Sequence, residues 1–305
     1  MPTLRFQLGK IPVAIAPSFL IVAVVFGLMG ALEGNPAILV AWIAIVFVSV
    51  LLHELGHATM GLAFGLEPRI ELHGLGGTTS WSSARPLSTG RRILISLAGP
   101  GAGFVLAAIV YFALGPGVFP ATPLGTFAYD NLLWVNFAWG LANLAPMLPL
   151  DGGNVMMQAL NALTGGRGER PARYVSIGVA ALAVPAGLLL FSNWWAAFLA
   201  LSFVGMNVRG LRDLAAREHD ATMRPALDQA RAALRANDGA RVLALARPVA
   251  LGAQGAATRA EALQLVAFGF LLEGRVPDAD AAVAALPTDF TVDPALIELR
   301  SRFAR

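Results

Sequence analysis

The sequence predicts an α-helical membrane protein. We expect a polytopic bundle of about six transmembrane helices with a short membrane-associated β-hairpin, followed by a small soluble α-helical domain. Of the 305 residues, 56% are hydrophobic and 13% are charged, whereas a soluble domain carries about 25% charged residues. The shortage of charge is concentrated before residue 209. We therefore assign residues 1–212 to the membrane domain and residues 213–305 to a cytoplasmic helical domain.

Six apolar segments are long enough to cross a bilayer, which takes about 20 residues in a helix. They cover residues 12–32, 36–60, 93–114, 127–148, 173–191 and 193–209. Arginine and lysine are absent from the alternate loops at 33–35, 115–126 and 192–193. The positive-inside rule then predicts a multi-pass protein of the cell membrane with both termini in the cytoplasm.

The membrane domain has two further local features, one between the second and third spans and one early in the third span. Residues 69–73 alternate in polarity, residues 74–77 are rich in glycine, and residues 78–81 are again β-prone, which predicts a short β-hairpin. Residues 96–103 form a run dominated by small side chains. Small residues let helices approach closely in lipid, so we expect tight packing there.

The polar tail has a helical pattern. We expect helices at residues 225–237, 240–249, 258–272 and 276–286. Such pairs are similar to tetratricopeptide repeats, although no clean period is present. The chain has no cysteine, which excludes disulfides and thiolate metal sites. No stripe of basic and aromatic residues indicates a nucleic-acid partner.

The motif His53-Glu54-Leu55-Gly56-His57 lies within a nearly uninterrupted apolar run. Ionisable residues inside a membrane are costly and mark functional sites. Two histidines at i and i+4 share one helix face and can both bind Zn²⁺, while the glutamate beside them can take a proton from a water molecule. The motif therefore predicts a zinc site with Glu54 as general base.

Catalytic zinc takes three protein ligands, and Asp151 is the best candidate for the third. It follows Pro146 and Pro149, which end an apolar span on the same side of the membrane as the histidines. The ordinary alternative is a turn residue before glycine. Asp130 falls at the opposite face, so topology excludes it. A loop histidine, His73, is more often incidental than a fourth ligand.

Asn143 precedes this turn in the same predicted span. Its amide could pack between helices or point at the reacting carbonyl. We favour the second role, because the residue lies about two helical turns before the proposed ligand Asp151.

These motifs together resemble the site-2 protease family of intramembrane zinc metalloproteases. The resemblance rests on residues 53–57, on residues 143–152 in a later span and on residues 96–100 between them, and it covers roughly residues 1–210. It implies Zn²⁺ held by His53, His57 and Asp151, with Glu54 as base. It also implies cleavage of a transmembrane protein substrate within the bilayer, as in regulated intramembrane proteolysis of anti-sigma factors.

The family's membrane-associated hairpin is thought to pair with unwound substrate by strand addition. The resemblance therefore implies substrate-binding roles for hairpin residues Gly74, Gly76, Gly77 and Thr78. We find neither the PDZ-like insert nor the CBS-type tail of some members. The tail at 213–305 could instead bind a cytoplasmic regulator or mediate self-association.

Two other functions are compatible with a metal site inside a membrane domain. A different class of membrane metalloprotease would use a glutamate as third ligand, and no glutamate lies between Glu71 and Glu169. A catalytically silent scaffold or a metal-binding transporter of the same fold is the non-enzymatic alternative. A transporter would repeat polar residues across several spans, and a scaffold would not need Glu54 beside the histidines.

Overall fold

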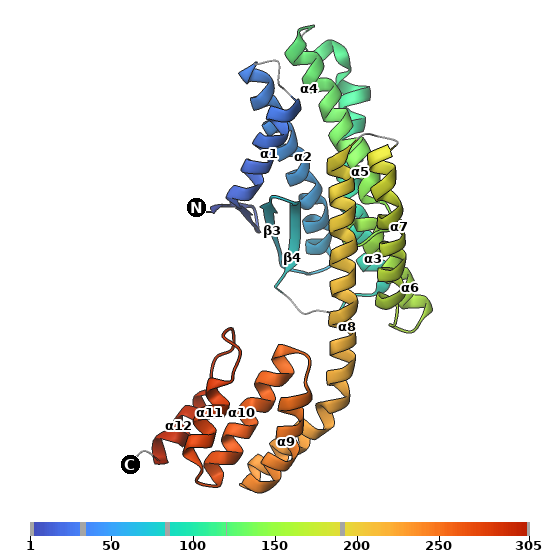
Figure 1. The fold of residues 1–305 in the computed structure, drawn as a ribbon. Coiled ribbons are helices and arrows are strands. Elements are labelled where there is room, and N and C mark those ends of the chain that lie inside the picture. Colours follow the sequence, from blue (N-terminus) through green and yellow to red (C-terminus); the bar gives the residue numbers. More distant parts are fainter. Residues whose placement is uncertain (1–2, 31–34, 83–85, 120, 190–192, 304–305) are drawn as a thin grey trace. The chain divides into compact units, whose positions relative to one another are not determined.

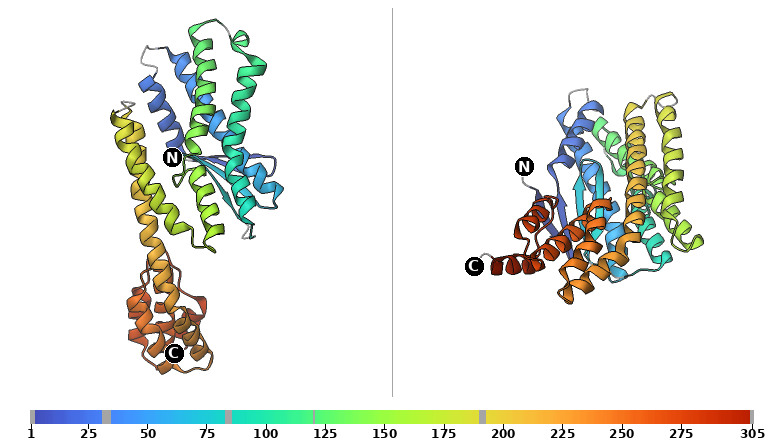
Figure 2. Two further views of the ribbon diagram at one scale, coloured as in Figure 1. Left: turned by 90° about the vertical axis from the view of Figure 1, so that its right-hand side faces the viewer. Right: turned by 60° about the horizontal axis from the view of Figure 1, so that its bottom comes forward.

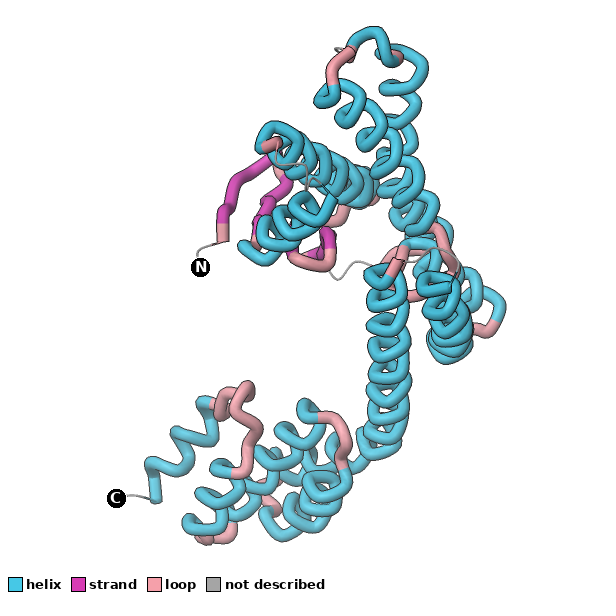
Figure 3. Tube along the Cα trace, turned by 45° about the horizontal axis from the view of Figure 1, so that its top comes forward, coloured by secondary structure: helices cyan, strands magenta, loops and turns pink. Residues whose placement is uncertain are grey.

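The computed structural model describes residues 3–30, 35–82, 86–119, 121–189 and 193–303. They form two compact units, Met1–Asn207 and Val208–Arg305, and the boundary falls inside helix α8 (Trp194–Arg235) (Figure 1). All strands of the described residues belong to the first unit (Figure 3).

The first unit contains a four-stranded sheet in the order β1-β2-β3-β4. Its strands are β1 (Leu4–Leu8), β2 (Ile11–Ile15), β3 (Pro68–His73) and β4 (Gly76–Trp81). The pairs β1–β2 and β3–β4 are antiparallel, and β2–β3 is parallel. The predicted hairpin is therefore present as β3–β4. It belongs to a larger sheet whose other half the sequence analysis missed.

The first predicted span is wrong at its start. Ile11, Val13 and Ile15 are buried while Pro12 is exposed, a period of two that belongs to a strand. Helix α1 (Pro17–Gly30) begins only after this strand. A continuous apolar run had concealed the change from strand to helix.

The remaining helices of the first unit follow in chain order. They are α2 (Pro36–Ala63), α3 (Thr89–Ala108) with the π-helical η1 (Ile109–Leu114), the 3₁₀ turn η2 (Pro116–Val118), α4 (Pro123–Leu133), the π-helical η3 (Trp134–Ala138), α5 (Trp139–Asn143), α6 (Asp151–Leu163), α7 (Glu169–Leu189) and the start of α8. Helices α7 and α8 run side by side (Figures 1 and 2), and Gly187 packs against the backbone of Ala197.

Three helices of the described residues are long and apolar enough to cross a membrane: Pro36–Ala63, Thr89–Leu114 and Glu169–Leu189. Pro17–Leu28 is a shorter apolar helix. The fourth predicted span is divided among α4, η3 and α5, and the sixth is the beginning of the much longer α8. The count of six spans therefore stays a prediction. Residues 31–32 and 190–192, where predicted spans end or turn, lie outside the described residues.

The second unit is helical throughout its described residues. It contains the end of α8, then α9 (Gly239–Gly252), α10 (Ala256–Leu272), α11 (Val276–Ala284) and α12 (Pro294–Phe303). Its core includes Leu227, Val242, Leu271 and Leu296. A helix beginning at Pro225 was predicted, and this is wrong, because Pro225 lies inside α8. The helix-forming Ala, Leu and Arg residues on both sides sustain the helix through it. Helix α12 was missed.

Candidate metal centre and its surroundings

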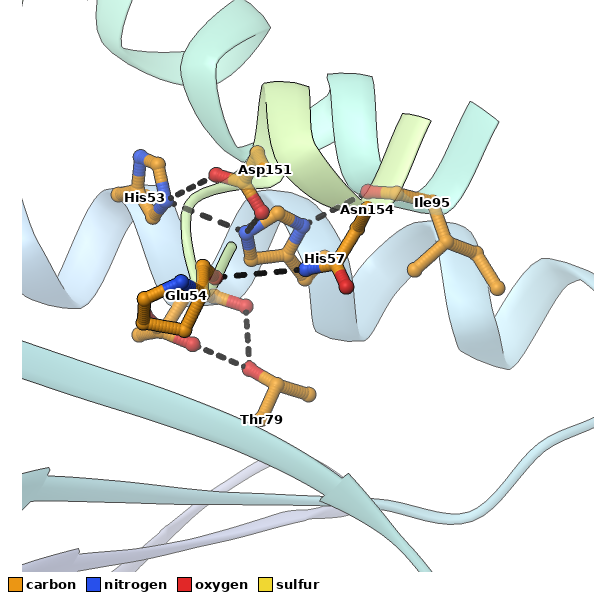
Figure 4. Close-up of polar contacts among 8 residues, drawn as sticks. His53, Glu54, His57, Thr79, Ile95, Asp151 and Asn154 are labelled. Atoms are coloured by element: carbon orange, nitrogen blue, oxygen red, sulfur yellow. Dashed lines mark hydrogen bonds and ion pairs between the residues drawn. The ribbon is translucent and has the colours of Figure 1, made fainter. Parts of the chain in front are cut away.

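Three metal-binding side chains meet inside the first unit. His53 and His57 come from α2, and Asp151 is the first residue of α6. Nε2 of His53 lies 3.1 Å from Asp151 Oδ2, and Nε2 of His57 lies 3.3 Å from Asp151 Oδ1. The two Nε2 atoms are 3.1 Å apart. The structure thus brings together the three ligands predicted from the sequence (Figure 4).

The donor set fits zinc. In tetrahedral coordination with zinc–nitrogen bonds of about 2.0–2.1 Å, neighbouring donor atoms lie about 3.3 Å apart. The three separations given above are close to this value. Two imidazole nitrogens and one carboxylate also match catalytic zinc sites, which keep a further position open.

A hydrogen bond on the side of the ring away from the metal centre fixes the orientation of His57. Its Nδ1 lies 2.7 Å from the backbone oxygen of Ile95. A carbonyl oxygen can only accept a hydrogen bond, so Nδ1 carries the proton and Nε2 offers its lone pair to the centre. Helix α3, which supplies Ile95, therefore sets the tautomer of a residue on α2.

Glycines allow the helices to come this close. A Cβ atom at Gly99 would collide with the imidazole of His57, and one at Gly56 would collide with the backbone oxygen of Ala98. The expected close packing along residues 96–103 is therefore present between α2 and α3. At the Asp151 turn, Cβ atoms at Gly152 and Gly153 would collide with the backbones of Leu144 and Leu148.

Glu54 is 4% exposed and lies against strand β4. The Thr79 hydroxyl donates a hydrogen bond of 2.6 Å to Oε2 of Glu54. Gly77 backs the same carboxyl group, because a Cβ there would lie 2.6 Å from Oε1. Thr79 was missed by the sequence analysis. The period of two in β4 could have found it, since Gly77, Thr79 and Trp81 all face α2.

The four predicted hairpin residues occupy different places. Only Gly77 contacts Glu54 among the four. Gly74 lies against α1, where its N–H bonds to Ser18 Oγ at 3.1 Å. Gly76 has φ 122° and begins β4 directly after the turn, where it pairs with His73. The exposed Thr78 points away from α2 and bonds to His73 at 2.9 Å. His73 is thus engaged within the hairpin, outside the metal-binding group.

The structure gives less support to Asn143 than to the ligands. It ends α5 and is half-buried, and its side chain takes part in none of the hydrogen bonds found among the described residues. A second amide, Asn154, lies beside the centre (Figure 4). Its Nδ2 is 3.5 Å from the Pro149 backbone oxygen. The sequence could have indicated Asn154, because it follows Asp151 by three residues and residues i and i+3 of a helix lie on one face.

The chain is similar in sequence to curated zinc metalloproteases. No protein-family model matches the chain. A Synechocystis protein with a provisional zinc metalloprotease name is 33% identical over 152 residues, covering 49% of this chain and 39% of that protein. A zinc metalloprotease of Methanocaldococcus jannaschii is 26% identical over 163 residues, covering 51% of this chain and 44% of that protein. The matches therefore span less than half the length of these curated relatives.

Among solved structures, the site-2 protease from Methanocaldococcus jannaschii is similar with a TM-score of 0.49 and 23% identity. The match covers 68% of this chain and 94% of the protease chain. With the motifs and the donor set described above, the matches to curated zinc metalloproteases support placing the chain in the site-2 protease family.

Proposed function

We propose that the chain is an intramembrane zinc metalloprotease. It would hydrolyse a peptide bond within or near the transmembrane helix of a membrane-protein substrate. One observation carries this proposal: a three-ligand group that fits zinc lies beside the buried carboxyl group of Glu54 on α2, a helix apolar enough to cross a membrane. The zinc metalloprotease names of the curated relatives agree with it.

In this proposal His53, His57 and Asp151 hold the zinc ion. When bound, the ion would polarise the scissile carbonyl and lower the pKa of a water molecule. Glu54 takes the proton of the attacking water and passes it to the leaving amine. Thr79 holds Glu54 Oε2 in place through its 2.6 Å hydrogen bond. Asn143 is proposed to donate a hydrogen bond to the oxyanion.

The substrate must arrive unwound. A carbonyl engaged in a helical hydrogen bond is poorly accessible, so helix-weakening residues in the substrate should favour cleavage. Strand β4 is at the edge of the sheet in the described residues and touches Glu54 through Gly77. An edge strand offers unpaired backbone groups. We propose that the hairpin, Gly74, Gly76, Gly77 and Thr78 included, receives the extended substrate by strand addition.

The setting proposed is the cell membrane, with a multi-pass chain and both termini in the cytoplasm. Substrates would be single-span membrane proteins, including those of the anti-sigma type. The unit Val208–Arg305 would bind a cytoplasmic regulator or a second copy of the chain.

The test is a cleavage assay on the full chain in detergent or liposomes, with single-span substrates and with zinc content measured in parallel. Glu54→Gln should retain zinc and lose cleavage, whereas Glu71→Gln, an exposed glutamate of β3, should keep both. Asp151→Ala should lose zinc, and Asp130→Ala, also exposed, should not.

Full zinc-dependent cleavage by Glu54→Gln would refute the assignment of the base. Zinc-loaded wild-type protein that cleaves none of the substrates would favour the scaffold or transporter. Folded wild-type protein without zinc would refute the metal site itself.

A further inference from the structure

We infer that Ser176 and Asn207 are positioning residues for the Asp151 carboxylate. Their side chains form hydrogen bonds with the N–H and the C=O of Leu148, just before the turn that places Asp151 in the metal centre. This inference rests on the proposed metal role of Asp151, and it assigns a task to two polar side chains that the proposed mechanism leaves unused.

Ser176 binds the amino side of Leu148. The residue lies on α7 and is 0% exposed. Its hydroxyl oxygen accepts a 2.9 Å hydrogen bond from the Leu148 N–H and donates a 2.7 Å bond to the Ala172 backbone oxygen. The second bond fixes the direction of the hydroxyl proton, so the lone pairs are directed to Leu148.

Asn207 binds the carbonyl side of Leu148. The residue lies on α8 and is 1% exposed. Its Nδ2 donates to the Leu148 oxygen at 2.7 Å and to the Phe203 oxygen at 2.9 Å. Both neighbours are carbonyl acceptors, so only the nitrogen can face them, and the orientation of the amide is determined.

The turn transmits this fixed position to the ligand. Only Pro149 and Leu150 separate Leu148 from Asp151. Proline restricts its own φ angle, and Leu150 donates a 2.9 Å backbone bond to the Met147 oxygen. Gly153, in the first turn of α6, packs directly on the backbone at residues 147–148. A displacement of Leu148 would therefore move Asp151 with it.

Asn207 carries a cost together with its two bonds. Oδ1 of Asn207 is buried and has no hydrogen-bond partner within the described part of the chain. A buried unpaired oxygen costs free energy, and this cost is offset by the two Nδ2 bonds, of which only the bond to the Leu148 oxygen reaches outside α8. Departures from local rules of this kind are expected where a site must be held in place.

The experiment compares zinc binding by the full chain in detergent. Ser176→Ala, Asn207→Ala and the double variant are measured against Ser202→Ala and Asn131→Ala. These controls lose the same bond to the carbonyl four residues earlier, 2.8 Å in both cases, and their side chains make no other hydrogen bond found in the described residues. Zinc affinity is measured by chelator competition, ligand geometry by the absorption spectrum of bound Co²⁺, and stability by thermal unfolding of the metal-free protein.

We expect each single variant to bind zinc about 10-fold more weakly, as for residues that orient metal ligands, and to change the Co²⁺ spectrum. The controls should do neither. Asn207→Leu has a similar side-chain volume and removes both donors, so it supplies the same comparison if Asn207→Ala does not fold.

Zinc affinities and Co²⁺ spectra equal to those of the controls would overturn the inference, whatever the change in stability. Wild-type protein that binds no zinc would instead overturn the proposed function on which it rests. The two failures are distinguishable because the second is visible before any variant is made.

Discussion

Gly99→Ala should disable the metal centre through a single methyl group. Gly99 lies on α3 opposite the histidine pair, where an added Cβ would be 2.9 Å from Nε2 of His53 and closer still to Nε2 of His57. Non-bonded heavy atoms rest at about 3.5–4.0 Å. Both imidazoles, or α3 itself, must therefore move.

The required movement can be estimated from these contacts. His53 must retreat by at least about 0.5 Å to restore an ordinary contact with the new methyl group, and His57 must retreat further. Zinc sites tolerate deviations of only about 0.2 Å in ligand distance. A misplacement of about 1 Å at a reacting centre costs about 100-fold in rate. We therefore expect Gly99→Ala to lose at least about 100-fold in zinc affinity and in cleavage rate.

Gly101→Ala provides the matched control on the same helix. A Cβ there would meet no other atom within 4 Å, and replacing glycine by alanine in a helix interior is stabilising by about 0.5–1 kcal/mol. Zinc content, zinc affinity and thermal unfolding should be measured for both variants. A Gly99→Ala protein with the zinc affinity of Gly101→Ala would refute the geometry described for the centre.

Three further predictions concern other parts of the molecule. Thr79→Val should lower kcat about 10-fold or more with zinc content unchanged, because a hydrogen bond to a charged group contributes about 1.5–3 kcal/mol. Thr79→Ser keeps the hydroxyl group and should retain activity. Equal rates for the two variants would contradict the role given to the 2.6 Å bond. Chelation should lower the thermal unfolding midpoint of wild type and leave that of Asp151→Ala unchanged, since a ligand at about 1,000 times its Kd stabilises by about 4 kcal/mol. In the second unit, burial would raise the pKa of Asp220, but the N–H groups of Gln254 and Gly255 and the Thr258 hydroxyl outweigh burial and hold the pKa below its usual value. The carboxylate therefore stabilises the unit above about pH 4, and this stabilisation decreases as pH falls below that value. Asp220→Asn should speed amide hydrogen exchange at residues 254–255 at neutral pH and abolish this acid dependence. Unchanged exchange would contradict the assignment.

The metal ligands were predictable from the sequence because their chemistry is local. The i, i+4 spacing places His53 and His57 on one helix face, and the turn after Pro149 isolates a single carboxylate near them. The structure brings all three together. The contributions of Ser176 and Asn207 were not predictable in this way, because the hydrogen bonds to Leu148 join residues 28 and 59 positions away in sequence.

The fold was predicted less evenly than the site. The β3–β4 hairpin and helices α2, α3 and α7 follow from local pattern, and the structure contains them. Strand β2 was missed because Val13 and Ile15 belong to an apolar run that continues into α1, and β1, which pairs with β2, was missed with it. Apolar runs of this kind do not distinguish a buried strand from the start of a helix, and only the pairing of β2 with β3 resolves the ambiguity.

The most direct test of the central claim is the position of the cut. A single-span substrate with one helix-weakening residue in its membrane segment would be incubated with zinc-loaded protein in liposomes, and the products would be identified by mass spectrometry. We predict cleavage inside the membrane segment, close to that residue, and none with Glu54→Gln. Cuts confined to the parts of the substrate outside the bilayer, or equal products from Glu54→Gln, would contradict the account.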